Sequence, residues 1–221
     1  MKQFRLLTAD EIECRVAQIK ANGLSLLLYK DARCDMNILD ETVGAMNWQN
    51  SYSRDNRNCT VSIRNENGEW ISKENTGTES NTESEKGLAS DSFKRACVNW
   101  GIGRELYSAP FIWIDKANCE IKADGTKYKC FDRFEVDNIE YDDKERICGL
   151  TIVRVKGRTR TEVYTYGNPM LPDGMQKTLA KVAKEHGYTE EKICGHFGVK
   201  RYSELNVEQF RRLMDSMGEA G

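Results

Sequence analysis

The sequence predicts an α+β protein, in which antiparallel β-strands are combined with a few amphipathic helices. In some stretches apolar residues recur at helical spacing, and in others short apolar runs are separated by turn signals. Two prolines, Pro169 and Pro172, mark a boundary near the end of the chain. We therefore expect three parts: an α+β core at residues 1–113, a β-rich extension of that core at 114–168, and a helical module at 169–221.

Cap and turn signals define the elements of the first eighty residues. Thr8 and Glu11 have the spacing of a capping box, which predicts a helix after them. Asn67-Gly68 is a strong hairpin signal. In chain order we expect a helix at about 9–22, a strand at 23–30, a helix at 35–46, and strands at 47–53, 59–65 and 68–77.

The next predicted helix, at about residues 83–100, follows a polar loop and has two different faces. Its apolar residues share one side: Leu88, Ala89, Phe93, Ala96, Cys97 and Trp100. Lys94 and Arg95 fall roughly opposite them, and Gly101 supplies the C-terminal cap. The helical period therefore separates a core face from a basic face.

The rest of the chain predicts strands and then short helices. Residues 111–168 contain several strand-like runs, with a turn at Asp124-Gly125. Three helices are expected within residues 173–217, a segment too short to bury a large core alone. Their predicted caps are Asp173, Thr189 and Asn206.

Composition excludes several classes of protein. The net charge is -2, so a nucleic acid would need a local groove of positive charge. No apolar run is long enough to cross a membrane, and the start of the chain lacks an apolar signal core, so we expect a cytoplasmic protein. The eight cysteines form no C-x-x-C pair, which indicates reduced thiols; we expect no metal site and no cofactor.

Signals for an enzyme are weak, so we expect none. The two histidines, His186 and His196, both lie in the predicted tail. One alternative stays open, because Glu120-Ile121-Lys122 with Asp115 upstream matches the E-x-K core of a class of metal-dependent nucleases. That chemistry places two carboxylates on Mg²⁺ and the lysine near the phosphate. The spacing is common by chance in a chain that is 31% charged, and a solvated strand face explains it more simply.

Signals for nucleic-acid binding are stronger. Phosphates bind Lys and Arg, and unstacked bases pack on aromatic or apolar surfaces. Lys94 and Arg95 are the central pair of this candidate site. The other candidates lie near them in sequence or in element order: Tyr29, Arg33, Arg54, Arg57, Lys86 and Arg104. For any one of these alone, a solvated surface side chain is the simpler explanation.

Residues 83–110 resemble the signature of the Rad-fifty-two superfamily of single-strand annealing proteins, and more closely its phage-encoded recombination members. The pattern is Asp91-x-x-Lys94-Arg95-Ala96, followed by Trp100 and Gly101. A second block, with Tyr29, Glu41, Gly44 and Trp48, has the spacing of the family's strand–helix–Trp element. The resemblance covers about residues 20–113.

The resemblance implies a fold and a site. The fold is an antiparallel sheet packed on a long central helix, with subunits side by side in a ring or helical oligomer and single-stranded DNA in a positive groove. Lys94 and Arg95 would hold phosphates, with Tyr29 at the same groove. Lys86 matches a further basic position of the pattern, before the central helix. Two positions depart from the family pattern, because Val98 and Glu66 stand where basic residues are usual.

The implied activity is annealing of complementary strands in phage homologous recombination, with no bond made or broken and no cofactor. A single-strand-binding protein that does not anneal is the other binding alternative. Residues 173–217 are expected either to dock a partner, such as host single-strand-binding protein or a phage exonuclease, or to complete the main core.

Overall fold

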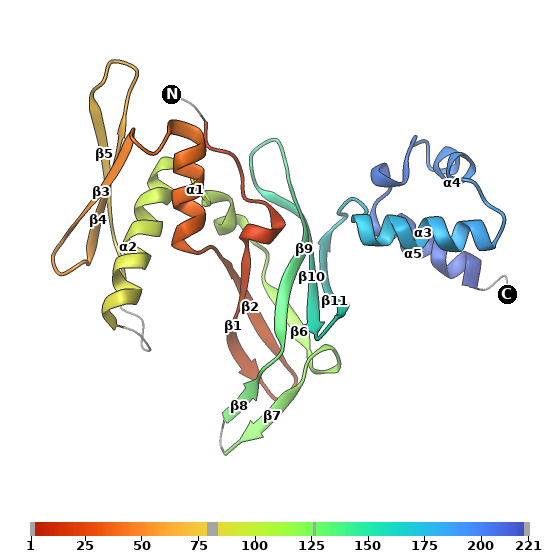
Figure 1. The fold of residues 1–221 in the computed structure, drawn as a ribbon. Helices are drawn as coiled ribbons and strands as arrows, with labels where there is room; N and C mark the ends of the chain where they lie inside the picture. Colours follow the sequence, from red (N-terminus) through yellow and green to blue (C-terminus); the bar gives the residue numbers. More distant parts are fainter. Residues whose placement is uncertain (1–2, 79–83, 126, 219–221) are drawn as a thin grey trace. The chain divides into compact units, whose positions relative to one another are not determined.

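The protein forms two compact units, shown in a computed structural model that describes residues 3–78, 84–125 and 127–218 (Figure 1). The first unit contains residues 1–15 and 28–109, and the second contains residues 16–27 and 110–221. Both units mix strands and helices, so the predicted α+β class is confirmed. The three predicted parts divide the chain at other positions, and that division stays a prediction.

A three-stranded antiparallel sheet covered by two helices builds the first unit (Figure 1). Its main elements are α1 (Ala32–Val43), β3 (Trp48–Ser53), β4 (Asn58–Arg64), β5 (Trp70–Thr76) and α2 (Ser84–Trp100). β4 is the central strand, and its alternate residues Cys59, Val61 and Ile63 are buried. Because strand side chains alternate, Thr60, Ser62 and Arg64 point to the other face.

That other face of the sheet is polar. The hydroxyl oxygens of Ser62 and Ser72 lie 2.8 Å apart, and Thr60 donates a hydrogen bond to Glu74 at 3.0 Å. The Arg64 guanidinium stacks over Trp70, 4.7 Å from its ring centroid. The sheet is therefore built to bury one face only.

The predicted hairpin at Asn67-Gly68 is confirmed. Gly68 has φ +83°, a backbone conformation that favours glycine, and the Asn65 side chain accepts hydrogen bonds from the backbone N–H groups of Asn67 and Glu69. These contacts join β4 to β5, which pair antiparallel from Arg64 opposite Trp70 to Asn58 opposite Thr76.

The helix predicted over residues 9–22 is wrong, although its cap is real. The Thr8–Glu11 capping box is present, but it begins only one 3₁₀ turn, η1 (Ala9–Glu11). The chain then continues as β1 (Glu13–Lys20) and β2 (Gly23–Tyr29). A capping box satisfies backbone groups of the first turn alone, and pairing with distant strands determines the conformation of the residues that follow.

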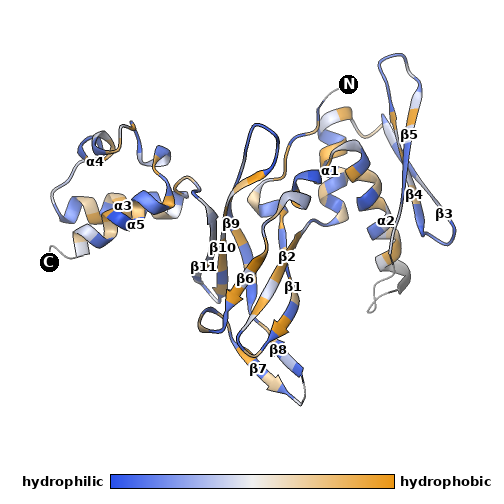
Figure 2. Ribbon diagram, turned by 180° about the vertical axis from the view of Figure 1, so that it is seen from behind, coloured by the Kyte–Doolittle hydropathy of each residue, from blue (hydrophilic) through white to orange (hydrophobic). Residues whose placement is uncertain are grey.

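β1 and β2 belong to a six-stranded sheet with the strand order β11-β10-β9-β1-β2-β6. The four remaining strands are β6 (Ile112–Asp115), β9 (Arg133–Tyr141), β10 (Ile147–Lys156) and β11 (Thr159–Gly167). The sheet is curled, so that its two edge strands, β11 and β6, approach each other. At this approach the Tyr164 hydroxyl donates a hydrogen bond to the Phe111 carbonyl at 3.3 Å. Figure 2 shows hydrophobic residues along these strands, and Leu24, Ile114 and Leu150 are fully buried. A small hairpin, β7 (Ile121–Asp124) with β8 (Lys127–Cys130), projects from this unit.

The expected single sheet on a long central helix is not the observed arrangement. α2 has 17 residues and packs on the three-stranded sheet, and no long central helix occurs in the described residues. Gly101 follows Trp100 with φ +109° and ends the helix. The strands beyond it pair with β1 and β2 in a second sheet, so the antiparallel strands are divided between two sheets and a small hairpin.

Short helices with their own hydrophobic cluster form the C-terminal segment. They are α3 (Asp173–Glu185), α4 (Glu190–His196), the 3₁₀ turn η4 (Tyr202–Glu204) and α5 (Val207–Gly218). Leu179 and Leu205 are fully buried in the cluster. The predicted capping box of the last helix is confirmed, because the Asn206 N–H donates to Gln209 at 2.9 Å and the Gln209 N–H donates to Asn206 at 2.8 Å. None of the helices that the structure describes is both long and apolar enough to span a membrane.

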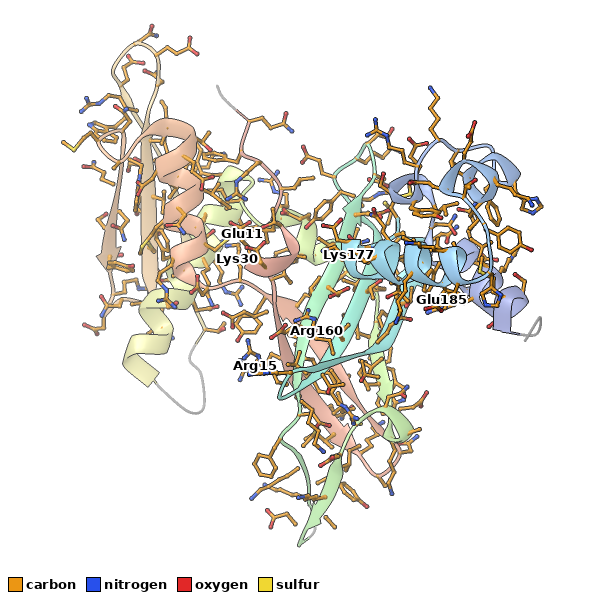
Figure 3. All side chains as sticks on the ribbon, turned by 45° about the vertical axis from the view of Figure 1, so that its right-hand side comes forward. Glu11, Arg15, Lys30, Arg160, Lys177 and Glu185 are labelled. Carbon is orange, nitrogen blue, oxygen red and sulfur yellow. The ribbon has the colours of Figure 1, made fainter. Side chains whose placement is uncertain are left out.

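Glu11 carries a pH-dependent part of the stability of the first unit (Figure 3). Its carboxylate accepts two hydrogen bonds of 2.7 Å from Arg5, and these bonds lower the pKa of Glu11 from 4.5 to about 2. A carboxyl group whose pKa falls on folding stabilises the folded state above pH 4.5, and this stabilisation is lost as the pH falls toward 2.

We therefore expect Glu11→Gln to lower stability near neutral pH and to flatten its decline between pH 4.5 and 2. Urea unfolding across that window, followed by circular dichroism, measures both effects. Glu191→Gln, which removes an exposed carboxylate from α4, is the charge-matched control. If stability falls as steeply between pH 4.5 and 2 in Glu11→Gln as in the wild-type protein, Glu11 is not the source of this pH dependence.

Candidate nucleic-acid interface

An open hollow of about 280 Å³ lies on the first unit, between the end of β2, one side of α2 and the 3₁₀ segment η2 (Arg104–Ser108). It contains both predicted central cations, Lys94 and Arg95. The complete lining is Leu28, Tyr29, Lys30, Asp91, Lys94, Arg95, Val98, Gly103, Leu106 and Tyr107.

α2 presents the cations because its opposite side is buried. Asp91, Lys94, Arg95 and Val98 follow one another at helical spacing along the hollow. Phe93, on the other side, is 1% exposed and packs near Trp48, with ring centroids 6.1 Å apart. The helical period thus separates the two faces as the sequence predicts.

Lys94 lies over an aromatic ring. Its Nζ atom is 5.9 Å from the ring centroid of Tyr29, within the range of a cation–π interaction. A tyrosine hydroxyl is protonated at neutral pH, and for Tyr29 the hydrogen bond to Glu13 and partial burial raise the pKa further, to about 12. The pair therefore offers a charged group beside a neutral aromatic face.

Arg95 is oriented by a carboxylate but remains accessible. Its Nε atom lies 2.8 Å from the Asp91 carboxylate, and its side chain is 39% exposed. Burial raises the pKa of Asp91, but hydrogen bonds from the Thr78 backbone N–H and from Arg95 outweigh burial and hold this pKa below its usual value. A guanidinium has five N–H donors, so Arg95 keeps donors for a further anion such as phosphate.

One lining residue, Lys30, belongs to a buried ion pair. Lys30, 4% exposed, contacts Asp35, which is fully buried (Figure 3 labels Lys30 beside α1). Burial raises the pKa of Asp35 to about 6, against the attraction of Lys30 and Lys94. Gly103 has φ +70°, and a Cβ atom there would overlap the Lys30 side chain, so only glycine fits beside this pair.

Two further predicted cations have local partners and lie outside the hollow. Arg104 donates hydrogen bonds to the carbonyl oxygens of Val98 at 2.9 Å and of Asn99 at 3.2 Å, so it caps the C-terminal end of α2. Arg33 is highly exposed and lies 3.0 Å from Asp31, the N-cap residue of α1.

In the part of the chain that the structure describes, the remaining predicted cations do not line the hollow. Arg54 and Arg57 belong to the turn between β3 and β4, where Arg54 has φ +53°. This turn contacts the sheet-facing side of α2, since Ser92 donates to the carbonyl of Asn56 at 3.0 Å. The side chain of Lys86 lies outside the described residues, as do residues 79–83 of the predicted polar loop.

Sequence reasoning missed Lys30, Leu106 and Tyr107 as lining residues. Lys30 ends an apolar run and offers no pattern of its own, and Leu106 and Tyr107 lie in a 3₁₀ turn without helical periodicity. One sequence signal for a tight turn at this point was the pair of glycines, Gly101 and Gly103. In the structure both adopt positive φ.

The alternative metal site gains no support. The Glu120 carboxylate pairs with Lys156, which lowers the pKa of Glu120, and Asp115 accepts a hydrogen bond from Trp113 at 3.1 Å. Within the described ranges, no group of three or more His, Cys, Asp or Glu side chains is arranged to hold a metal ion.

The structure is thus an α+β protein with an open hollow lined by cationic and aromatic side chains. Such a lining is suited to a negatively charged polymer that carries planar groups. Residues 58–124 match the family model described as Rad52/22 family double-strand break repair protein. The match spans less than a third of the 221-residue chain and contains both Lys94 and Arg95. Neither the curated proteins nor the solved structures give a match.

The buried Lys30–Asp35 pair yields a prediction about stability. Lys30→Met leaves the Asp35 carboxylate buried without its counter-ion, and Asp35→Leu leaves the Lys30 ammonium in the same position. We expect each substitution to lower the free energy of unfolding by about 3–5 kcal/mol. The double variant should recover most of this loss, because it contains no unpaired buried charge.

Urea unfolding of the four proteins in this mutant cycle measures the coupling between the two residues. Additive losses in the double variant would show that the two side chains do not stabilise each other.

Proposed function

We propose that the protein binds single-stranded DNA and promotes annealing of complementary strands in homologous recombination. One observation carries this proposal: Lys94 and Arg95, both within the segment matched by the Rad52/22 family, line one open hollow together with Tyr29. The cations neutralise phosphates, and base pairing with a second strand supplies the free energy of annealing. The reaction makes and breaks no covalent bond, so the protein acts without catalysis and without a cofactor.

Repetition of this site along one strand supplies the affinity. A single subunit offers only a few contacts, and linking sites along one polymer raises the overall affinity strongly. We therefore propose a ring or helical homo-oligomer that carries the strand from one hollow to the next. A protein of this kind fits phage or prophage recombination inside a bacterial host cell.

The C-terminal helices are proposed to dock a partner protein, such as host single-strand-binding protein or a phage exonuclease. The support is that this segment has its own hydrophobic cluster around Leu179 and Leu205, as expected of an interaction module.

The first test removes the two central charges. Lys94→Ala with Arg95→Ala should weaken binding of a fluorescent oligonucleotide and flatten the dependence of affinity on salt. For single strands the slope of log K against log salt changes by about 0.7 for each phosphate contact that is lost. Lys177→Ala with Lys181→Ala is the matched control, because it removes two exposed cations from α3. Wild-type affinity and slope in the first variant, or equal losses in both, would refute the site assignment.

The same proteins separate annealing from simple coating of a strand. Wild-type protein should accelerate pairing of complementary oligonucleotides in a fluorescence-quenching assay, and the Lys94/Arg95 variant should not. A protein that binds both strands without accelerating their pairing is a non-annealing single-strand-binding protein.

The second test concerns the C-terminal helices. Deletion of residues 170–221 should leave binding to single-stranded DNA intact and lower recombination of an oligonucleotide in bacterial cells. Unchanged recombination with the shortened protein would exclude the proposed docking role. Loss of DNA binding would indicate instead that these helices complete the main core.

A further inference from the structure

Tyr107 is an exposed aromatic residue at the hollow that holds Lys94 and Arg95. Its side chain is 73% exposed, and it lies beside the apolar and cationic lining of the hollow. Neither helical nor strand periodicity marks this position in the sequence. What distinguishes Tyr107 from other exposed apolar side chains is that it lines the same hollow as Lys94 and Arg95.

The segment that carries Tyr107 is fixed on both sides. Glu105 is buried and accepts a 2.8 Å hydrogen bond from the backbone N–H of Leu7, and Arg104 is bonded to the last carbonyl groups of α2. Ile102, just before this turn, is fully buried. The backbone of η2 is therefore held in position before any ligand arrives, which reduces the entropic cost of binding.

The lining of the hollow is divided by chemistry. Leu28, Val98 and Leu106 contribute apolar surface, and Lys94 and Arg95 contribute charge. Two aromatic rings, those of Tyr29 and Tyr107, belong to the same lining. The volume of about 280 Å³ lies just below the range for sites of drug-sized ligands, about 300–1,000 Å³, and so suits one small planar group.

We propose that the hollow receives one nucleobase of the bound strand in each subunit, and that Tyr107 stacks on this base while Lys94 and Arg95 hold the adjacent phosphate. This inference rests on the proposed function and deepens it. Every base has a π-face, so the site accepts any sequence, as an annealing protein requires. A base held in this way is withheld from pairing until the complementary strand draws it out.

Tyr107→Ala should lower the affinity for a short thymidine oligonucleotide by about 5- to 150-fold, the equivalent of one stacked base. The salt slope should stay at the wild-type value, because no phosphate contact is lost. Tyr107→Phe should retain the wild-type affinity. Tyr128→Ala is the matched control, since it removes a partly exposed tyrosine from β8.

An abasic oligonucleotide of the same length completes the experiment. Wild-type protein should bind it more weakly than the thymidine strand, and Tyr107→Ala should bind it as wild type does. Equal binding of the two strands by wild-type protein, or an equal loss on both strands in Tyr107→Ala, would overturn the inference and leave phosphate binding at Lys94 and Arg95 standing. Failure of wild-type protein to bind either strand would refute the proposed function itself.

Discussion

Burial of one side of α2 against β4 is the constraint on which the candidate site depends. Phe93 and Trp100 are almost fully buried, and the Trp100 indole N–H donates to the Val61 carbonyl at 3.0 Å. These contacts fix both the rotation of the helix and its position along the strand. Since rotation about the helix axis is fixed, Lys94 and Arg95 must face the hollow. The functional surface is thus determined by the packing of the opposite, apolar side.

The charges around the hollow are balanced by nearby groups. Asp91 orients Arg95, and Asp35 neutralises Lys30 beneath the surface. A bare group of cations would repel itself and would not hold a fixed geometry. Because Arg95 and Lys30 are each paired with a carboxylate, their side chains hold their positions without a ligand. The exposed parts of Lys94 and Arg95 can still bind phosphate. The buried pair restricts the sequence as well, because Gly103 must leave room for the Lys30 side chain.

Local signals in the sequence predicted local structure well. The hairpin at Asn67-Gly68, the helix ending before Gly101 and the capping box of Asn206 are each determined by neighbouring residues, and all three are present. The prediction at residues 9–22 is wrong because β1 lies between β2 and β9 in the sheet, and the capping box at Thr8 records neither the turn to β2 nor the pairing with β9, more than a hundred residues away. The helical period likewise placed Lys94 and Arg95. Helical periodicity could not place Tyr107, because Tyr107 lies in a 3₁₀ turn. It also could not show that Arg104 donates hydrogen bonds to the last carbonyl groups of α2.

The polar outer surface of the three-stranded sheet limits how copies of the protein can associate through it. Pairs such as Ser62 with Ser72 are satisfied by each other and offer little apolar area for a second layer. Among the described strands, β3 and β5 each pair only with β4, so each keeps one open side. A second copy that added to this sheet would therefore do so laterally, at the open side of β3 or β5, and the natural twist between adjacent strands would rotate each added copy relative to the one before it.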